Sequence, residues 1–197
     1  MKIAIIGAGY VGLVSAACFA ELGHTVICLD ADAAKIGLLA DGTIPLYEPG
    51  LAELVKQNLR RARLRFTTAW PEAVGGADVV FIAVGTPTSR RGNGYADMSY
   101  VYEAARSLAP HFATYTVVVN KSTVPVGTAR HVAAVIREAN PAAEYDVASN
   151  PEFLREGDAV RDFMHPDRVV CGVQTARARA VLEAVYRPLA ANGATVL

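Results

Sequence analysis

"KIAIIGAGYVGLVSAACFA", residues 2–20, joins an apolar run to a glycine-rich turn and a helical pattern. The run at 2–7 has strand character, and Gly7, Gly9 and Gly12 follow it with the spacing G-x-G-x-x-G. At such a junction the first glycine permits a tight turn, the second lets a phosphate group approach the backbone, and the third allows the helix to pack closely on the strand. N–H groups at the helix start can bind the anion. The stretch therefore predicts a phosphate-binding turn.

Asp30 lies at the end of the next apolar run, at 25–30 and eighteen residues after Gly12. An acid about 20 residues beyond the glycines is typical of proteins that bind a dinucleotide, because its carboxylate accepts hydrogen bonds from the adenosine ribose. It would also repel a 2′-phosphate, which favours NAD over NADP. The alternative is that the glycines serve only the turn and that Asp30 caps a helix beginning near Asp32.

Strand-like and helical patterns alternate along the rest of the chain. The strand-like runs are mostly continuously apolar, as expected of parallel strands buried on both faces, and they lie at 64–68, 78–85, 115–122, 145–149, 168–173 and 194–197. Helical patterns are predicted at about 10–23, 32–40, 50–62, 98–109, 128–139 and 175–187. Two long connections lie at 41–50 and 85–98, and connections of this length in a compact domain are commonly functional. The alternation predicts an α/β fold, a Rossmann-like doubly wound and mainly parallel sheet with helices on both faces.

Polar residues follow several of these strands. Thr86 comes after the run at 78–85, Ser122 and Thr123 end the run at 115–122, and Glu152 follows the run at 145–149. Ligands of doubly wound sheets bind beyond the carboxyl ends of the strands. We therefore expect these residues and the glycine turn to converge on one crevice.

Composition excludes several classes of function. With 19 basic and 19 acidic residues among 197, the chain has no net charge that would favour nucleic acid or an anionic membrane. Its cysteines, Cys18, Cys28 and Cys171, form no CxxC pair, so we expect small core residues, no metal site and a reducing, cytoplasmic location. The apolar start contains three glycines and runs into a second strand, which argues against a signal peptide.

Five motifs resemble one family when read in order: "GAGYVGL" (7–13), "LYEPGL" (46–51), "VGTPT" (84–88), "KSTVPVGT" (121–128) and "NPEFLREG" (150–157). They are similar to the amino-terminal half of the UDP-glucose 6-dehydrogenases, within the UDP-glucose/GDP-mannose dehydrogenase family. The GDP-mannose and UDP-N-acetylmannosamine branches share the plan but differ in these loops, so they are the alternatives for the substrate.

The resemblance implies a set of site residues. It implies that NAD is contacted by the turn residues Gly7, Gly9, Tyr10, Val11 and Gly12 and by Asp30, Lys35, Thr86, Thr123 and Glu152. It implies that a nucleotide-sugar pocket is lined by Glu152, Phe153, Leu154, Arg155 and Glu156. In this family UDP-glucose is oxidised twice to UDP-glucuronate with two NAD, through a thioester on a cysteine. Thr123 is then expected to hold a water, and Glu152 to be the base for the water that hydrolyses the thioester.

One part of the family pattern does not occur in this sequence. The nucleophilic cysteine lies in a later "GGSCFPKD"-like segment, and a lysine and an asparagine come from a connecting helix; the chain contains none of these. We therefore expect residues 1–197 to be the NAD-binding domain alone, without the connecting helix and UDP-sugar domain, and inactive by itself. The full-length enzyme is expected to be a homodimer. A stand-alone NAD-sensing module is the alternative. A short-chain reductase is excluded, because that class needs a Tyr-x-x-x-Lys pair and no tyrosine of this sequence has a lysine four residues later.

Overall fold

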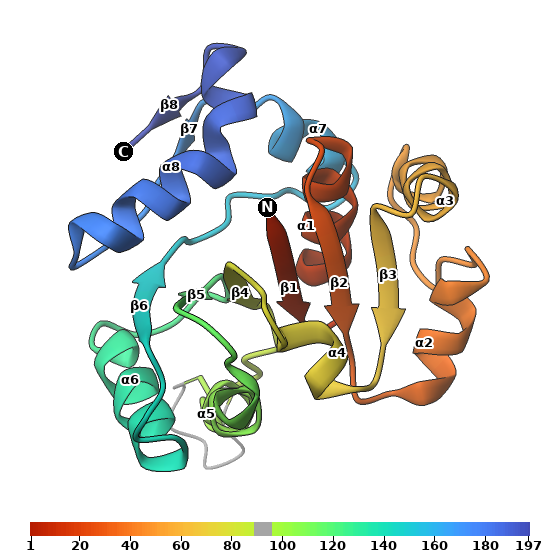
Figure 1. Cartoon of the computed structure of the whole chain (residues 1–197). Helices are drawn as coiled ribbons and strands as arrows, with labels where there is room; N and C mark the ends of the chain where they lie inside the picture. Colours follow the sequence, from red (N-terminus) through yellow and green to blue (C-terminus); the bar gives the residue numbers. More distant parts are fainter. Residues whose placement is uncertain (89–95) are drawn as a thin grey trace.

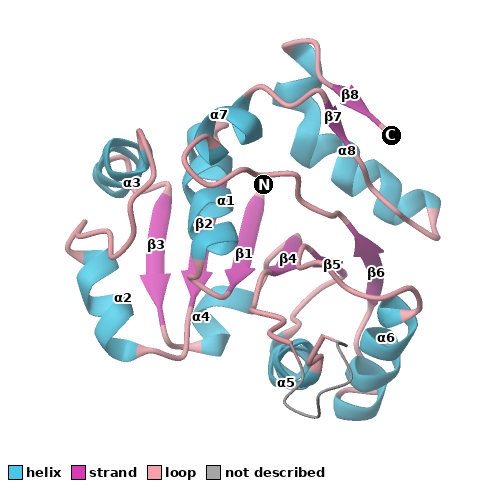
Figure 2. Ribbon diagram, turned by 180° about the vertical axis from the view of Figure 1, so that it is seen from behind, coloured by secondary structure: helices cyan, strands magenta, loops and turns pink. Residues whose placement is uncertain are grey.

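The computed structural model describes residues 1–88 and 96–197. Its main sheet has six parallel strands in the order β3-β2-β1-β4-β5-β6. In chain order the strands are β1 (Lys2–Ile6), β2 (Thr25–Leu29), β3 (Leu64–Thr67), β4 (Val79–Ile82), β5 (Thr116–Asn120) and β6 (Tyr145–Ser149). Figure 2 shows β3 at one end of this sheet and β6 at the other. The order changes direction at β1, which places a crevice between the carboxyl ends of β1 and β4.

Helices cover both faces of the sheet, as predicted. One face packs against α1 (Tyr10–Glu21), α3 (Leu51–Arg60), α7 (Ala159–Met164) and α8 (Ala176–Ala191). The other packs against α4 (Trp70–Val74), α5 (Ser99–Leu108), α6 (Thr128–Ala139) and the 3-10 turn η1 (Ala109–His111). The remaining helix, α2 (Ala33–Ala40), contacts β3 at the end of the sheet. Figure 1 shows α7 and α8 on one side of the molecule and α5 and α6 on the opposite side.

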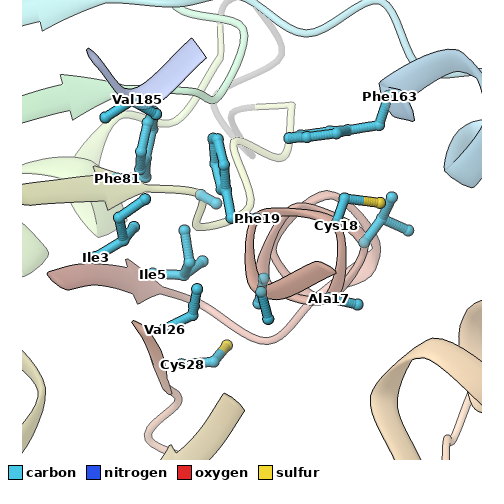
Figure 3. Close-up of a cluster of buried hydrophobic side chains, with 14 of the residues drawn as sticks. Ile3, Ile5, Ala17, Cys18, Phe19, Val26, Cys28, Phe81, Phe163 and Val185 are labelled. Atoms are coloured by element: carbon cyan, nitrogen blue, oxygen red, sulfur yellow. The ribbon is translucent and has the colours of Figure 1, made fainter. Parts of the chain in front are cut away.

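An aromatic cluster joins the glycine-turn helix to the rest of the core. Phe19 of α1 stacks on Phe81 of β4 and meets Phe163 of α7 edge to face, with both centroid distances 5.0 Å. Figure 3 shows these rings together with the apolar side chains of β1 and β2. Because Phe19 is fully buried, this packing fixes α1, and with it the glycine turn, against the sheet.

The carboxyl-terminal part of the fold differs from the prediction. The runs at 168–173 and 194–197 do not extend the main sheet: they form only β7 (Arg168–Val169) and β8 (Thr195–Val196), which pair with each other. A bridge between Ser149 and Gly172 links this pair to β6. The short helices α4, α7 and η1 were not predicted, and residues 89–95 of the predicted connection at 85–98 lie outside the described residues. Among the described helices none is long and apolar enough to cross a membrane.

Candidate functional site

The three glycines of the turn have different physical roles. Gly7 has a φ of +103°, and a Cβ there would lie 2.8 Å from the carbonyl oxygen of Ala83. A Cβ on Gly12 would lie 1.8 Å from the carbonyl oxygen of Gly7. A Cβ on Gly9 would meet nothing within 4 Å. Gly7 and Gly12 are therefore required by the fold, whereas the space over Gly9 is open to a ligand.

The start of α1 leaves backbone donors available beside that open space. Gly9 is the N-cap residue and offers no side-chain cap. The first N–H groups of a helix have no intrahelical partner, and the helix dipole adds positive potential there. A pyrophosphate supplies the acceptors that these groups lack. This geometry fits a dinucleotide at the position that the glycine spacing predicts.

Asp30 is held in place directly after β2. Its carboxylate accepts hydrogen bonds from the N–H groups of Ala8 at 2.7 Å and Asp32 at 3.0 Å, and from the ammonium of Lys35 at 3.1 Å. Burial alone would raise the pKa of Asp30, but these three donors hold the pKa below its ordinary value. A carboxylate has about four acceptor sites, so an ionised Asp30 keeps one for a ribose hydroxyl. The alternative prediction, that Asp30 caps this helix, is wrong, because the N-cap residue of α2 is Asp32.

Thr86 and Thr123 lie together, as expected of residues after neighbouring strands. The hydroxyl of Thr86 donates to the carbonyl oxygen of Thr123 at 3.4 Å. The hydroxyl of Ser122 donates to the carbonyl oxygen of Val84 at 2.7 Å. These bonds tie the loop after β4 to the loop after β5, at the same edge of the sheet as the glycine turn.

Glu152 and its neighbours line a second region, an open cleft of about 780 Å³ between α7, α8 and the end of β5. Glu152 accepts a hydrogen bond from the N–H of Leu154 at 2.6 Å. Phe153 is 61% exposed, and Glu156 is exposed as well. The guanidinium of Arg155 pairs with Asp162 at 2.6 Å. Thr86, Thr123 and Glu156 are not among the described residues that line this cleft.

Lys121 is a residue of this cleft that sequence reasoning missed. It is 4% exposed, its ammonium donates to Oδ1 of Asn150 at 3.0 Å, and the hydroxyl of Tyr186 donates to the same oxygen. Burial lowers the pKa of Lys121 to about 8. The two residues lie in the motifs "KSTVPVGT" and "NPEFLREG", but only the structure shows that both are buried and hydrogen-bonded to each other.

The three cysteines are poor nucleophiles. Cys18 and Cys28 are fully buried, and burial raises the pKa of Cys18 to about 12 and that of Cys28 further. Cys171 is half-buried, against the expectation of a core position, and burial raises the pKa of its thiol to about 11. Thiolates, the reactive form, are therefore scarce at neutral pH. Within residues 1–88 and 96–197 no group of His, Cys, Asp and Glu is arranged to hold a metal.

The doubly wound parallel sheet, the glycine turn after its first strand and the anchored acid after its second define a dinucleotide-binding domain of the Rossmann type. The sequence matches the UDP-glucose/GDP-mannose dehydrogenase family, NAD binding domain, over residues 1–190. The chain belongs to this family, and NAD is the cofactor of its domain type.

Curated relatives support this assignment. The chain is 59% identical over 194 residues to the UDP-glucose 6-dehydrogenase of Rhizobium meliloti (strain 1021), covering 98% of the chain and 44% of that protein. It is 50% identical over 188 residues to the UDP-glucose 6-dehydrogenase TuaD of Bacillus subtilis (strain 168), covering 95% and 40%. The chain thus spans less than half the length of these relatives.

Solved structures of dehydrogenases also match this fold. The fold matches a ternary complex of GDP-mannose dehydrogenase from Pseudomonas aeruginosa with a TM-score of 0.93 and 36% identity, covering all of this chain and 46% of that one. It matches a UDP-glucose dehydrogenase from Pyrobaculum islandicum with a TM-score of 0.92 and 42% identity, covering 99% and 45%.

Proposed function

We propose that this chain is the NAD-binding part of an enzyme that oxidises UDP-glucose to UDP-glucuronate. The observation that carries the proposal is the pairing of a phosphate-binding turn with the "NPEFLREG" loop on one domain. An NAD sensor needs the first of these features but has no use for an acidic loop beside a cleft. The higher-identity relatives named above are UDP-glucose dehydrogenases, which supports this sugar nucleotide over GDP-mannose.

In this proposal the cofactor follows the carboxyl edge of the sheet. The start of α1 binds the pyrophosphate, with Gly9, Tyr10 and Val11 beside it, while Asp30 and Lys35 face the adenosine ribose. Thr86 and Thr123 lie toward the nicotinamide. Bound there, NAD supplies a hydride acceptor for each of two oxidations.

The remaining residues act on the sugar and on water. The loop from Glu152 to Glu156 orients the nucleotide sugar so that its primary alcohol faces the cofactor, because proximity and orientation dominate such transfers. Thr123 holds a water that relays the alcohol proton. Glu152 takes the proton of the hydrolytic water in the last step, as general base. The nucleophilic thiol comes from another part of the longer protein, since the three thiols of this chain are buried or half-buried with raised pKa values.

The experiment that tests this function uses the chain joined to its downstream sequence. Glu152→Gln should slow hydrolysis of the thioester more than the first hydride transfer, because an amide is too weak a base for water. We expect a burst of NADH, then a stalled steady state and a protein mass raised by the trapped acyl group. Glu138→Gln, at an exposed position, is the matched control and should turn over like the parent.

Two results would contradict the proposal. Loss of the burst together with the steady state would make Glu152 a binding residue and not the hydrolytic base. Faster oxidation of GDP-mannose than of UDP-glucose by the parent enzyme would replace the substrate.

A further inference from the structure

Glu48 is a buried carboxylate in the connection between α2 and α3. It is 5% exposed and accepts hydrogen bonds from the Gly157 N–H at 2.8 Å and from the Ala159 N–H at 2.9 Å, with a longer contact from Val160 at 3.5 Å. The hydroxyl of Tyr10 donates to the same carboxylate. Its partners in the described part of the chain are therefore hydrogen-bond donors from two other segments.

These bonds join the two regions of the candidate site. Tyr10 belongs to the glycine turn, whereas Gly157 ends the "NPEFLREG" loop. The Tyr10 hydroxyl also lies 3.3 Å from the N–H of Gly157 and 3.4 Å from the carbonyl oxygen of Arg155. One carboxylate thus connects the turn assigned to the cofactor with the loop assigned to the nucleotide sugar.

The charge on Glu48 makes this connection strong. Burial alone would raise the pKa of Glu48, but the hydrogen bonds from Tyr10 and the three backbone N–H groups hold the pKa below its ordinary value. The side chain is therefore ionised at neutral pH. Hydrogen bonds to an ionised acceptor are roughly twice as strong as neutral ones.

Among the described residues, Asn150 anchors the start of the loop. Its N–H donates to the carbonyl oxygen of Asn120, and its side chain bonds Lys121, Tyr186 and the carbonyl oxygen of Val170. The side-chain bonds of Glu152 and Arg155 stay within the loop and the neighbouring α7. Phe153 is largely exposed. Leu154 packs against the core in the middle of the loop. At the far end, the hydrogen bonds that lead away from the loop and α7 are, among the described residues, those with Glu48 and Tyr10.

We propose that Glu48 is a positioning residue that holds the loop of residues 152–157 against Tyr10, so that the loop meets the nucleotide sugar in register with the cofactor. This inference rests on the proposed function for the role of the loop. Glu48 itself touches neither substrate nor the reacting atoms and acts through the loop.

The first test follows amide hydrogen exchange in the 197-residue chain. In Glu48→Gln the amide cannot present two acceptor oxygens, so a charge-assisted bond is lost. We expect the amides of Gly157 and Ala159 to exchange about tenfold faster, since one such bond is worth at least about 1.4 kcal/mol. The amides of β5 should keep their rates. Glu53→Gln, at an exposed position on α3, is the matched control and should change neither.

The second test measures steady-state kinetics in the chain joined to its downstream sequence. Glu48→Gln should raise the KM for UDP-glucose about tenfold while kcat stays within about threefold, as expected when binding is lost uniformly. A merely structural role would reduce the folded fraction and lower the apparent kcat at an unchanged KM. Tyr10→Phe removes one hydroxyl and keeps the carboxylate, so it should give a smaller rise and serves if Glu48→Gln fails to fold.

The outcomes separate this inference from the proposed function. Unchanged exchange at Gly157 and Ala159, or an unchanged KM for UDP-glucose in both variants, overturns the role of Glu48. A parent enzyme that does not oxidise UDP-glucose overturns the proposed function, and the exchange rates still decide whether Glu48 holds the loop.

Discussion

Gly9 is the glycine of the turn that could be substituted without disturbing the fold, so its role in ligand binding can be tested by itself. Its φ is −76°, an ordinary value, and a Cβ there has no neighbour within 4 Å. Gly7 and Gly12 lie against backbone oxygens at 2.8 Å and 1.8 Å. These distances agree with the roles that the G-x-G-x-x-G spacing predicts: packing requires Gly7 and Gly12, whereas the space over Gly9 is open to a ligand.

Substitutions at the three glycines should divide accordingly. Gly9→Val should abolish NAD binding and leave the melting temperature within a few degrees of the parent, since the side chain occupies the path of the pyrophosphate. Gly12→Ala should lower stability by at least about 2 kcal/mol, because overpacking against backbone has no flexible neighbour to move. Calorimetric titration and thermal melting measure the two effects. Failure of Gly9→Val to fold would show that the glycine is structural.

Asp30 should determine the choice of cofactor. Asp30→Ala should weaken NAD binding about tenfold, since a hydrogen bond to a charged group contributes about 1.5–3 kcal/mol, and should weaken NADP binding less because Lys35 is then free of its carboxylate partner. Asp32→Ala is the matched control: it removes the α2 cap and costs about 1 kcal/mol of stability without changing the preference. An equal loss for both cofactors in Asp30→Ala would remove Asp30 from the ribose.

At the scale of the element, the six strands of the main sheet were predictable from the sequence, whereas the arrangement of the chain after β6 was not. The runs that became β1, β2, β4 and β5 are continuously apolar because both of their faces are covered, so their pattern is unambiguous. The two-residue strands β7 and β8 lie in longer apolar runs, and nothing local shows that they pair only with each other. Helix α7 has six residues, too few for a helical period to stand out.

The residues of the candidate site were likewise predictable only in part. Asp30 follows β2 directly, and Thr86 and Thr123 come a few residues after β4 and β5, so the sheet alone placed them at its carboxyl edge. The burial of Glu48 was not predictable, because its backbone partner Gly157 lies 109 residues away in sequence. Long-range contacts of this kind leave no periodic signal.

Lys121, at the end of β5, should make stability depend on pH. Burial holds its pKa at about 8 in the folded state, below the ordinary 10.5. Between these values the unfolded chain binds more protons, so the free energy of unfolding rises as pH increases from about 8 to about 10.5. Lys121→Met removes this contribution, and the stability of the parent relative to the variant should rise across that interval. Denaturant unfolding at several pH values measures the difference.

Lys56→Met is the control for this prediction, because Lys56 is exposed on α3 and its substitution should give a difference that does not change with pH. A flat difference for Lys121→Met as well would mean that the amine is solvated in the folded state.

At the scale of the whole molecule, the fold is an NAD-binding domain, and we propose that the loop of residues 152–156 adds part of a nucleotide-sugar site to it. The glycine turn, Asp30 and the threonines occupy the carboxyl edge of the sheet, and the acidic loop borders an open cleft beside them. By itself the chain should therefore produce no steady NADH from UDP-glucose at saturating NAD. We propose that the nucleophilic thiol comes from another part of the protein. Removing one of several catalytic groups that act as a unit lowers the reaction rate by many orders of magnitude. Joining the downstream sequence should restore turnover. Robust NADH production by the 197 residues alone would contradict the proposal that the nucleophilic thiol lies elsewhere in the protein.

NAD binding at the glycine turn is tested most directly by a calorimetric titration of the 197-residue chain with NAD and with NADP at the same ionic strength. We expect one saturable site for NAD, weaker binding of NADP, and no binding of NAD to Gly9→Val. Absence of NAD binding to the folded parent chain, or equal affinity for the two cofactors, would contradict it.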